Sequence, residues 1–264
     1  MGRVRRTRTV PNPAKRRLGG DSSRPAAFAS DLDRTLVRTG GPVTDAARTA
    51  LGDARRLGLR TVIVSGREYD KLVPFAHALG SVDAIVAENG AVVEAPLGRR
   101  PTVVAGSFAR VVRQRLAGAS GISPRFGTVV VSVPIRQHRR LVRALEGLPV
   151  HFLPNVDRVM ALPPGIDKGT GVRLALSRFG GGRGDYAALG DGENDLDLLQ
   201  GAALSGAVAN AQPIVRAAAD YVCRGHCARG ALEFVRGPLA AWASGTAARG
   251  RPRGGRRASG RAPR

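Results

Sequence analysis

Short apolar segments alternate with amphipathic segments through the middle of the chain. Residues 26–30 and 59–64 are mostly apolar, which predicts two buried strands. Between them, Thr44 precedes a run of apolar residues at helical spacing, and Gly58 follows it. This pattern predicts a helix with Thr44 as its N-cap and Gly58 at its end. Its apolar positions are Ala47, Ala50, Leu51, Ala54 and Leu57.

The alternation continues beyond this helix. It predicts a helix over 68–79 and a strand over 84–87. After an interruption it resumes with helices and strands in turn, over 168–178, 186–189, 194–199, 203–208 and 213–218. Strands that alternate with helices are typical of a parallel sheet covered by helices on both faces. We therefore expect an α/β fold.

The interruption has a pattern of its own. Helices are predicted over 108–116 and 137–145, and strands over 128–133, 150–153 and 158–162. Because this segment splits the regular alternation, we interpret residues 91–162 as an inserted α/β cap. The core domain is then formed by residues 25–90 together with residues 163–242.

The net charge of +22 over 264 residues is concentrated at the two ends of the chain. Residues 1–24 hold eight Lys or Arg and one Asp, and residues 243–264 hold seven Arg and no acidic residue. Both segments are poor in large apolar residues, so neither can bury enough surface to offset the entropy lost on ordering. We expect two disordered basic tails, either solvated or weakly bound to a polyanion such as nucleic acid.

Two classes of protein are excluded by the sequence. The two cysteines, Cys223 and Cys227, are too few for a disulfide framework and, without further ligands, for a structural zinc site. No stretch reaches the roughly 18 to 20 apolar residues that cross a bilayer, and the basic N-terminus lacks the apolar core of a secretory signal. We expect reduced cysteines and a cytoplasmic protein, with its oligomeric state open.

Polar residues follow several of the predicted strands. Asp31 and Asp33 follow the first strand, Ser65 and Gly66 follow the second, and the segment 190–195 follows a later one. Because parallel strands end at the same edge of a sheet, we expect these residues to meet there. Lys168 begins the helix that comes directly after the predicted cap, so it is expected at the same edge.

Carboxylates that converge on one edge repel one another unless a cation neutralises them. Mg²⁺ prefers oxygen ligands and leaves coordination positions open for a phosphate group. The ammonium of Lys168 and the hydroxyl of Ser65 suit the oxygens of that phosphate. The residues therefore predict a Mg²⁺-dependent phosphoryl-transfer site with a carboxylate as the nucleophile.

Four motifs, in this order, resemble the haloacid dehalogenase superfamily of phosphatases. They are Asp31-Leu32-Asp33-Arg34-Thr35, Ser65-Gly66, Lys168 and Gly190-Asp191-Gly192-Glu193-Asn194-Asp195. The large insertion between the second and third motifs resembles the branch of the Cof-like, sucrose-phosphate and mannosyl-3-phosphoglycerate phosphatases. The resemblance implies a Rossmann-like core with an α/β cap. It also implies a phosphomonoester hydrolase that acts on a small sugar phosphate or phosphorylated sugar acid through an aspartyl-phosphate intermediate.

The resemblance implies a role for each matched residue. Asp31 is the nucleophile, and Asp33 donates a proton to the leaving oxygen and later takes one from the attacking water. The implied Mg²⁺ ligands are Asp31, Asp33 through its main-chain carbonyl, Asp191 and Asp195. The implied phosphate and substrate contacts are Ser65, Gly66, Lys168 and Asn194.

Several alternatives stay open. Arg34 stands where the family commonly has glycine, and it either adds an anion contact or points outward. Six cap arginines either face a second anionic group of the substrate or form a solvated surface: Arg125, Arg136, Arg139, Arg140, Arg143 and Arg158. The motifs also allow a sugar phosphomutase, in which a sugar hydroxyl replaces water as the acceptor. A nucleic-acid-associated protein that binds through its basic tails is a further alternative.

Overall fold

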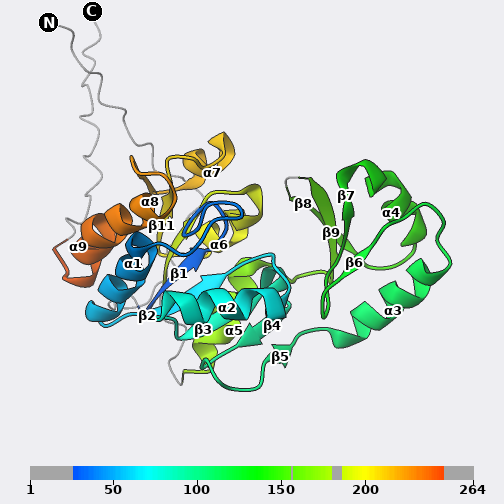
Figure 1. Cartoon of the computed structure of the whole chain (residues 1–264), viewed down its shortest axis with the longest axis horizontal. Coiled ribbons are helices and arrows are strands. Elements are labelled where there is room, and N and C mark those ends of the chain that lie inside the picture. The colour runs from blue at the N-terminus through cyan, green and yellow to red at the C-terminus, as the bar shows by residue number, and fades with distance from the viewer. Residues whose placement is uncertain (1–25, 156, 180–185, 247–264) are drawn as a thin grey trace, which may run out of the picture.

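The computed structural model describes residues 26–155, 157–179 and 186–246, which form a central sheet flanked by helices and a smaller part beside it (Figure 1). Residues 1–24 and 247–264 lie outside the described residues, so the two basic tails stay predictions. Ala243, which we placed at the start of the second tail, ends helix α9 (Ala240–Ala243).

Eight strands form the central sheet. They are β1 (Ala27–Asp31), β2 (Arg60–Val64), β3 (Ala84–Ala87), β4 (Val92–Glu94), β5 (Thr102–Val103), β10 (Tyr186–Gly190), β11 (Leu204–Ala207) and β12 (Tyr221–Val222). Their order is β12-β11-β10-β1-β2-β3-β4-β5. Neighbours from β12 to β3 are parallel, whereas β4 and β5 are antiparallel to the strands beside them. Strands β1 and β10 are fully buried, as expected for central strands covered on both faces.

Helices cover both faces of this sheet. They are α1 (Asp45–Arg56), α2 (Tyr69–Leu79), α5 (Lys168–Ser177), α6 (Leu196–Gln200), α7 (Pro213–Ala218), α8 (Cys227–Phe234) and the π-helical turn η4 (Val235–Leu239) before α9. Helices α1 and α2 connect β1 to β2 and β2 to β3, toward one edge of the sheet. Helices α6 and α7 connect β10 to β11 and β11 to β12, toward the other edge. Since parallel crossovers are right-handed, the two pairs of helices lie on opposite faces. Helix α8 packs against α1, and α5 packs against α6.

Capping residues determine where the helices beside the site begin. The side chain of Thr44 accepts a hydrogen bond from the amide of Ala47 and caps α1, as predicted. At the start of α5, Asp167 accepts from the amide of Thr170 at 2.6 Å, and the Thr170 hydroxyl accepts from the amide of Asp167 at 2.9 Å. This reciprocal capping box makes Lys168 the first residue of α5.

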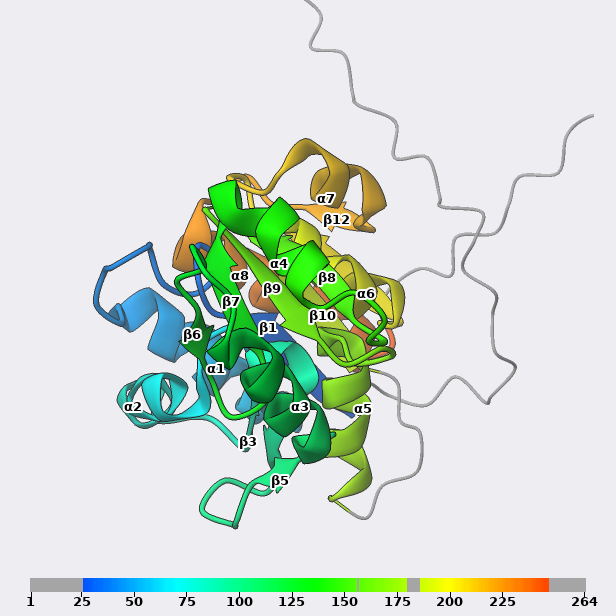
Figure 2. The ribbon, with the colours of Figure 1, turned by 90° about the vertical axis from the view of Figure 1, so that its right-hand side faces the viewer.

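The cap, as the structure describes it, runs from α3 to β9. It contains α3 (Gly106–Ala117), β6 (Arg125–Phe126), β7 (Val131–Pro134), the short helix η2 (Ile135–Gln137), α4 (His138–Ala144), β8 (His151–Asn155) and β9 (Arg158–Leu162). Its antiparallel sheet has the order β6-β7-β9-β8. One face packs on α3 and α4, which lie on the side away from the core (Figure 1). Seen from the cap, strands β7, β9 and β8 lie in front of β1 and β10 (Figure 2).

The structure confirms the α/β fold with an inserted cap. It also contains elements that were not expected, among them β6, β12 and α8, and two differences concern the segment between core and cap. Strands β4 and β5 pair with the central sheet although they fall inside the predicted cap segment 91–162. The domain limits themselves stay predictions. The strand predicted over 128–133 was wrong for residues 128–130, because their amides donate to the carboxylate of Glu88 instead of to a strand. Strand β7 therefore begins at Val131.

Two further findings bear on the expected protein class. Cys223 and Cys227 are both free thiols, and burial raises the pKa of Cys223 to about 12. Within the described ranges, no helix combines the length and apolar composition needed to cross a membrane.

Candidate active site

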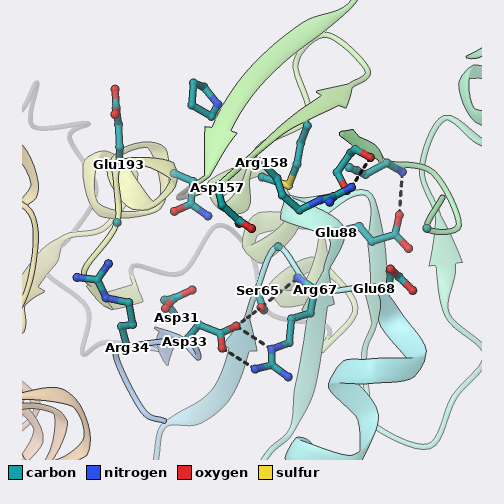
Figure 3. A pocket seen from close by; sticks show the side chains of 18 of the residues that line it. Asp31, Asp33, Arg34, Ser65, Arg67, Glu68, Glu88, Asp157, Arg158 and Glu193 are labelled. Atoms are coloured by element: carbon teal, nitrogen blue, oxygen red, sulfur yellow. Dashed lines mark hydrogen bonds and ion pairs between the residues drawn. The ribbon is translucent and has the colours of Figure 1, made fainter. Parts of the chain in front are cut away.

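A cleft of about 790 Å³ lies between the carboxyl edge of the central sheet and the cap (Figure 3). The core contributes six of the predicted site residues to its lining: Asp31, Asp33, Ser65, Gly66, Asp191 and Asn194. The other two, Lys168 and Asp195, lie beneath it in contact with each other, and Lys168 also contacts Asp31. The structure therefore brings all eight predicted residues to one edge.

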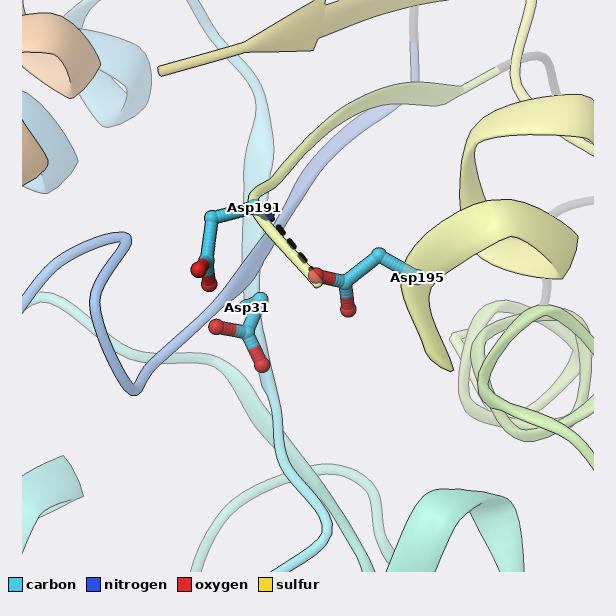
Figure 4. Close-up of side chains that lie close together, drawn as sticks. All are labelled: Asp31, Asp191 and Asp195. Atoms are coloured by element: carbon cyan, nitrogen blue, oxygen red, sulfur yellow. Dashed lines mark hydrogen bonds between the residues drawn. The ribbon is translucent and has the colours of Figure 1, made fainter. Parts of the chain in front are cut away.

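Three buried carboxylates form the centre of this site (Figure 4). Asp31 ends β1, Asp191 follows the neighbouring strand β10, and Asp195 ends the short helix η3 (Glu193–Asp195). Each offers an oxygen, and these oxygens lie within 4.8 Å of one another. Because β1 and β10 are directly paired, the ends of the two strands place Asp31 and Asp191 side by side.

Lys168 lies between two of these carboxylates. Its Nζ is 2.6 Å from Oδ1 of Asp31 and 2.6 Å from Oδ1 of Asp195, and the residue is 1% exposed. Burial lowers the pKa of Lys168, but the charges of Asp195 and Asp31 outweigh burial and hold the pKa above its usual value. Lys168 is therefore a buried, charged ammonium that neutralises part of the charge of Asp31 and Asp195.

The electrostatics of the cluster fit a divalent cation. Burial, and then the charge of Asp195, raises the pKa of Asp31 well above its usual value. Burial and the same neighbouring charge raise the pKa of Asp191 to about 6. Three carboxylates against the buried Lys168 and the partly exposed Arg34 leave an excess of negative charge that a cation would offset. Since all the donors are carboxylate oxygens, the set suits a hard ion such as Mg²⁺.

Asp195 also shapes the loop that carries Asp191. Its Oδ2 accepts from the amides of Asp191 and Gly192, both at 2.9 Å. A Cβ at Gly190 would lie 2.7 Å from the Asp195 carboxylate, so glycine is required where the two segments approach. Asp195 thus orients Asp191 and pairs with Lys168 at the same time.

The side chain of Asp33 turns away from the three carboxylates and toward Arg67. The guanidinium donates to both of its oxygens, from Nε to Oδ2 at 2.8 Å and from Nη2 to Oδ1 at 2.6 Å. Arg67 in turn lies over the ring of Phe75, 4.4 Å from its centre. Sequence reasoning missed Arg67 as a site residue, although it directly follows the Ser65-Gly66 motif.

Ser65 connects Asp33 and Arg67. Its hydroxyl accepts from the amide of Arg67 at 3.1 Å and lies 3.4 Å from Oδ2 of Asp33. The second motif therefore contacts the predicted acid and base and lines the cleft.

Residues 28–101 and 156–235 match the family of haloacid dehalogenase-like hydrolases. The chain belongs to this family. The match covers every motif that carried the resemblance and the core strands except β5, which begins one residue after the first matched segment. It confirms the predicted superfamily and the hydrolase class of this enzyme.

Relatives of this haloacid dehalogenase-like hydrolase agree with that assignment. The phosphoglycolate phosphatase of Methanothermobacter thermautotrophicus is 28% identical over 221 residues, which cover 80% of this chain and 97% of that protein. A crystal structure from Thermoplasma acidophilum has a TM-score of 0.70 at 15% identity, covering 82% of this chain and 100% of that one. A sugar phosphatase of subclass IIB has a TM-score of 0.61 at 18% identity, covering 75% of this chain and 92% of that one. At these identities the two structures establish the fold.

Arg34, where the family commonly has glycine, points into the site of this hydrolase. Its φ of 62° lies in the left-handed region, which accounts for the usual glycine. The side chain lies with Nε 3.2 Å from Oδ2 of Asp191 and donates from Nη2 to the carbonyl of Asn210. The hydroxyl of Thr35, which sequence reasoning also missed, donates to Oδ1 of Asp191 at 3.1 Å. Both residues hold the Asp191 carboxylate in place.

Asparagine and glutamate side chains connect the core of this hydrolase to its cap. Asn194 donates to Oδ1 of Asn89 at 3.3 Å, and Asn89 lies with Nδ2 3.2 Å from Sδ of Met160 on β9. Glu88, in the short helix η1 (Glu88–Gly90), accepts from three successive cap amides at 2.7 to 2.8 Å. These contacts bring cap strand β9 and the segment 128–130 against the catalytic edge.

Proposed function

We propose that this hydrolase is a Mg²⁺-dependent phosphatase that acts on a small phosphorylated metabolite, a sugar phosphate or a phosphorylated sugar acid, through an aspartyl phosphate on Asp31. The observation that carries the proposal is the cluster of Asp31, Asp191 and Asp195 oxygens within 4.8 Å, with Lys168 bonded to two of them. A carboxylate nucleophile beside a cation site is what phosphoryl transfer requires.

Asp31 begins the reaction with its carboxylate oxygen. That oxygen attacks phosphorus, the bond from phosphorus to the substrate oxygen breaks, and Asp33 donates the proton that the leaving oxygen needs. Water then attacks the phosphorus of the aspartyl phosphate and gives its proton to Asp33. This second step releases inorganic phosphate and restores Asp31, so no other reactant is consumed.

The residues around Asp31 support these steps. Lys168 favours the ionised carboxylate of Asp31 and offers its ammonium to the phosphoryl oxygens. Arg67 donates to both oxygens of Asp33 and fixes its position at the edge of the cleft, and Asp33 turns from Arg67 to give its proton to the leaving oxygen. Asp31, Asp191 and Asp195 would hold Mg²⁺, with the main-chain carbonyl of Asp33 as a further ligand. When bound, the ion would offset negative charge on the phosphoryl group.

The relatives support the choice of substrate class. One is named for phosphoglycolate, a small phosphorylated acid, and the other is named as a sugar phosphatase. The cap covers one side of the cleft, which helps to shield a small substrate from bulk water.

Asp31→Asn tests the nucleophile directly. We expect phosphate release from para-nitrophenyl phosphate to fall by at least about 10³-fold. Thermal unfolding should show an intact fold, because the amide oxygen of Asn can still accept from Lys168, which also keeps its bond to Asp195. Asp45→Asn on the exposed start of α1 is the matched control and should keep full activity. Hydrolysis by Asp31→Asn at the wild-type rate would refute the nucleophile. A rate independent of Mg²⁺ after exhaustive chelation would refute the metal dependence.

A further inference from the structure

The cap sheet has two different faces. Val131 and Val133 on β7, with Val159 and Ala161 on β9, are buried against α3 and α4. Side chains alternate along a strand, so the residues between them point the other way. These are Ser132 on β7 and Arg158 and Met160 on β9, and Arg125 on β6 is paired with Ser132 and shares its direction. All four line the cleft.

Arg158 is held in place on this face. Its Nε donates to the hydroxyl of Ser132 at 3.0 Å and its Nη2 donates to the carbonyl of Ser132 at 2.7 Å. Burial, and then the charge of Arg125, lowers the pKa of Arg158. Two cationic groups are thus kept close enough to repel each other, and the remaining N–H groups of Arg158 have no acceptor among the described side chains.

The acidic residues nearby do not neutralise these two arginines. In the described part of the chain, neither Arg125 nor Arg158 has a carboxylate within 4.0 Å. Glu68 is paired with Lys71 at 2.8 Å, and the carboxylate of Glu88 is occupied by backbone amides. Asp157, which is exposed, is the remaining acid on the cap side of the cleft. Two arginines against one aspartate leave one net positive charge on this wall.

We infer that Arg125 and Arg158 form a cap subsite for the carboxylate of a short phosphorylated hydroxy acid. This inference rests on the proposed phosphatase function and adds the substrate class. In Figure 3, Arg158 descends from the cap on the side of the cleft opposite Asp31 and Asp33. A substrate with its phosphate at Asp31 therefore directs its other end to the arginines. The single net charge of the wall matches a monoanionic carboxylate better than a dianionic second phosphate.

The same geometry separates the six arginines that the sequence left open. Arg125 and Arg158 line the catalytic cleft. Arg136 lies in η2, and Arg139, Arg140 and Arg143 lie on α4, the helix on the outer side of the cap sheet. Arg143 is exposed and gives a control with the same change of charge in the same domain.

The test compares two substrates that differ in one group. Phosphoglycolate carries a carboxylate where hydroxyethyl phosphate carries a neutral hydroxymethyl group. With Mg²⁺ present, we expect the full chain to prefer phosphoglycolate by at least about tenfold in kcat/KM. Arg158→Gln and Arg125→Gln should each reduce this preference by about tenfold, mainly through KM for phosphoglycolate. Arg143→Gln should preserve it.

Other outcomes are equally decisive. A wild-type chain without preference, or a preference unchanged in both variants, would overturn the cap subsite. Equal loss on both substrates would also overturn it, because that result indicates a displaced cap. Faster hydrolysis of ethylene glycol bisphosphate than of phosphoglycolate would show that the cap subsite prefers a second phosphate to a carboxylate. That result would refute the assigned substrate class.

A binding measurement separates this inference from the proposed function. Calorimetry can follow phosphoglycolate binding to the Asp31→Asn chain, with and without Arg158→Gln. Weaker binding in the double variant than in Asp31→Asn supports the subsite, whatever the activity of the wild-type chain. A wild-type chain that releases no phosphate would overturn the phosphatase function alone. Equal binding in the two chains would overturn the subsite alone.

Discussion

The guanidinium of Arg67 holds both carboxylate oxygens of Asp33, at 2.6 and 2.8 Å. The pair joins the end of β1 to the end of β2, two neighbouring parallel strands. The position of Asp33, the proposed acid and base, therefore depends on Arg67, a residue that does not itself contact the carboxylate cluster.

Arg67→Met should therefore slow the reaction without weakening substrate binding. The freed Asp33 side chain can adopt unproductive rotamers, so we expect kcat to fall about 10- to 100-fold while KM for para-nitrophenyl phosphate stays within about twofold. Stability should change by no more than about 1 kcal/mol, because the pair is partly exposed to solvent. Arg67→Lys, which retains the positive charge but not the two parallel hydrogen bonds of the guanidinium, should recover part of kcat. An unaltered kcat in Arg67→Met would show that Asp33 needs no such support.

Mg²⁺ should stabilise the fold more at neutral than at acidic pH. The pKa of Asp191 is raised from 3.8 to about 6 in the folded chain, so the metal-free fold binds this proton more tightly than the unfolded chain does. Its contribution to stability is present below about pH 4 and is lost as pH rises through about 6. Mg²⁺ requires the ionised carboxylates and reverses that loss. Saturating Mg²⁺ should raise Tm by about 5 to 10 °C near pH 7.5 and much less near pH 5.

Differential scanning fluorimetry at both pH values measures this effect. Asp191→Asn removes one ligand and should abolish most of the Mg²⁺-dependent shift, whereas Asp45→Asn should retain it. A shift of equal size at the two pH values would contradict the proposed competition between Mg²⁺ and protons.

Glu88→Gln should loosen the contact between core and cap. The carboxylate is 1% exposed and accepts from three amides of segment 128–130, but a Gln side chain has one accepting oxygen. At least one buried amide then loses its acceptor, and we expect the free energy of unfolding to fall by about 1 to 3 kcal/mol. Urea denaturation measures this loss.

The same change should lower kcat/KM for phosphoglycolate and for hydroxyethyl phosphate by a similar factor, since it displaces the whole cap wall. Glu146→Gln, at an exposed position in the cap, is the matched control and should change neither stability nor activity. A Glu88→Gln chain as stable as the wild type would show that the three amides find other acceptors.

Much of the core could be predicted because its signals are local. Thr44 before an amphipathic run indicated α1, and the structure has this cap with four of the five expected apolar positions buried; Leu57, the fifth, is exposed at the C-cap. The helix predicted over 213–218 has those same limits. Asp31, Asp191 and Lys168 were expected at one edge because each stands at the end of a strand or the start of a helix, and parallel strands end together.

Long-range contacts decided the remaining features. Residues 128–130 had the composition of a strand, but a buried carboxylate some 40 residues away in the chain takes their amides. Arg67 had no local sign of a partner, since its bond to Asp33 depends on the pairing of β1 with β2. Strands β5 and β12 are the two edge strands of the central sheet. With two residues each, they are too short for an alternating apolar pattern to indicate them.

The sequence by itself determined the family, the alternation of strands and helices, and the chemistry available at the strand ends, since these depend on residue types and on their spacing along the chain. Tertiary structure alone decided that Arg34 turns toward Asp191 and that Arg125 and Arg158, among six cap arginines, line the cleft. The direction of a side chain in the cap depends on strand register and on the face that packs against α3 and α4. Burial across the whole cap sheet sets this direction, and the local pattern of charged residues does not predict it.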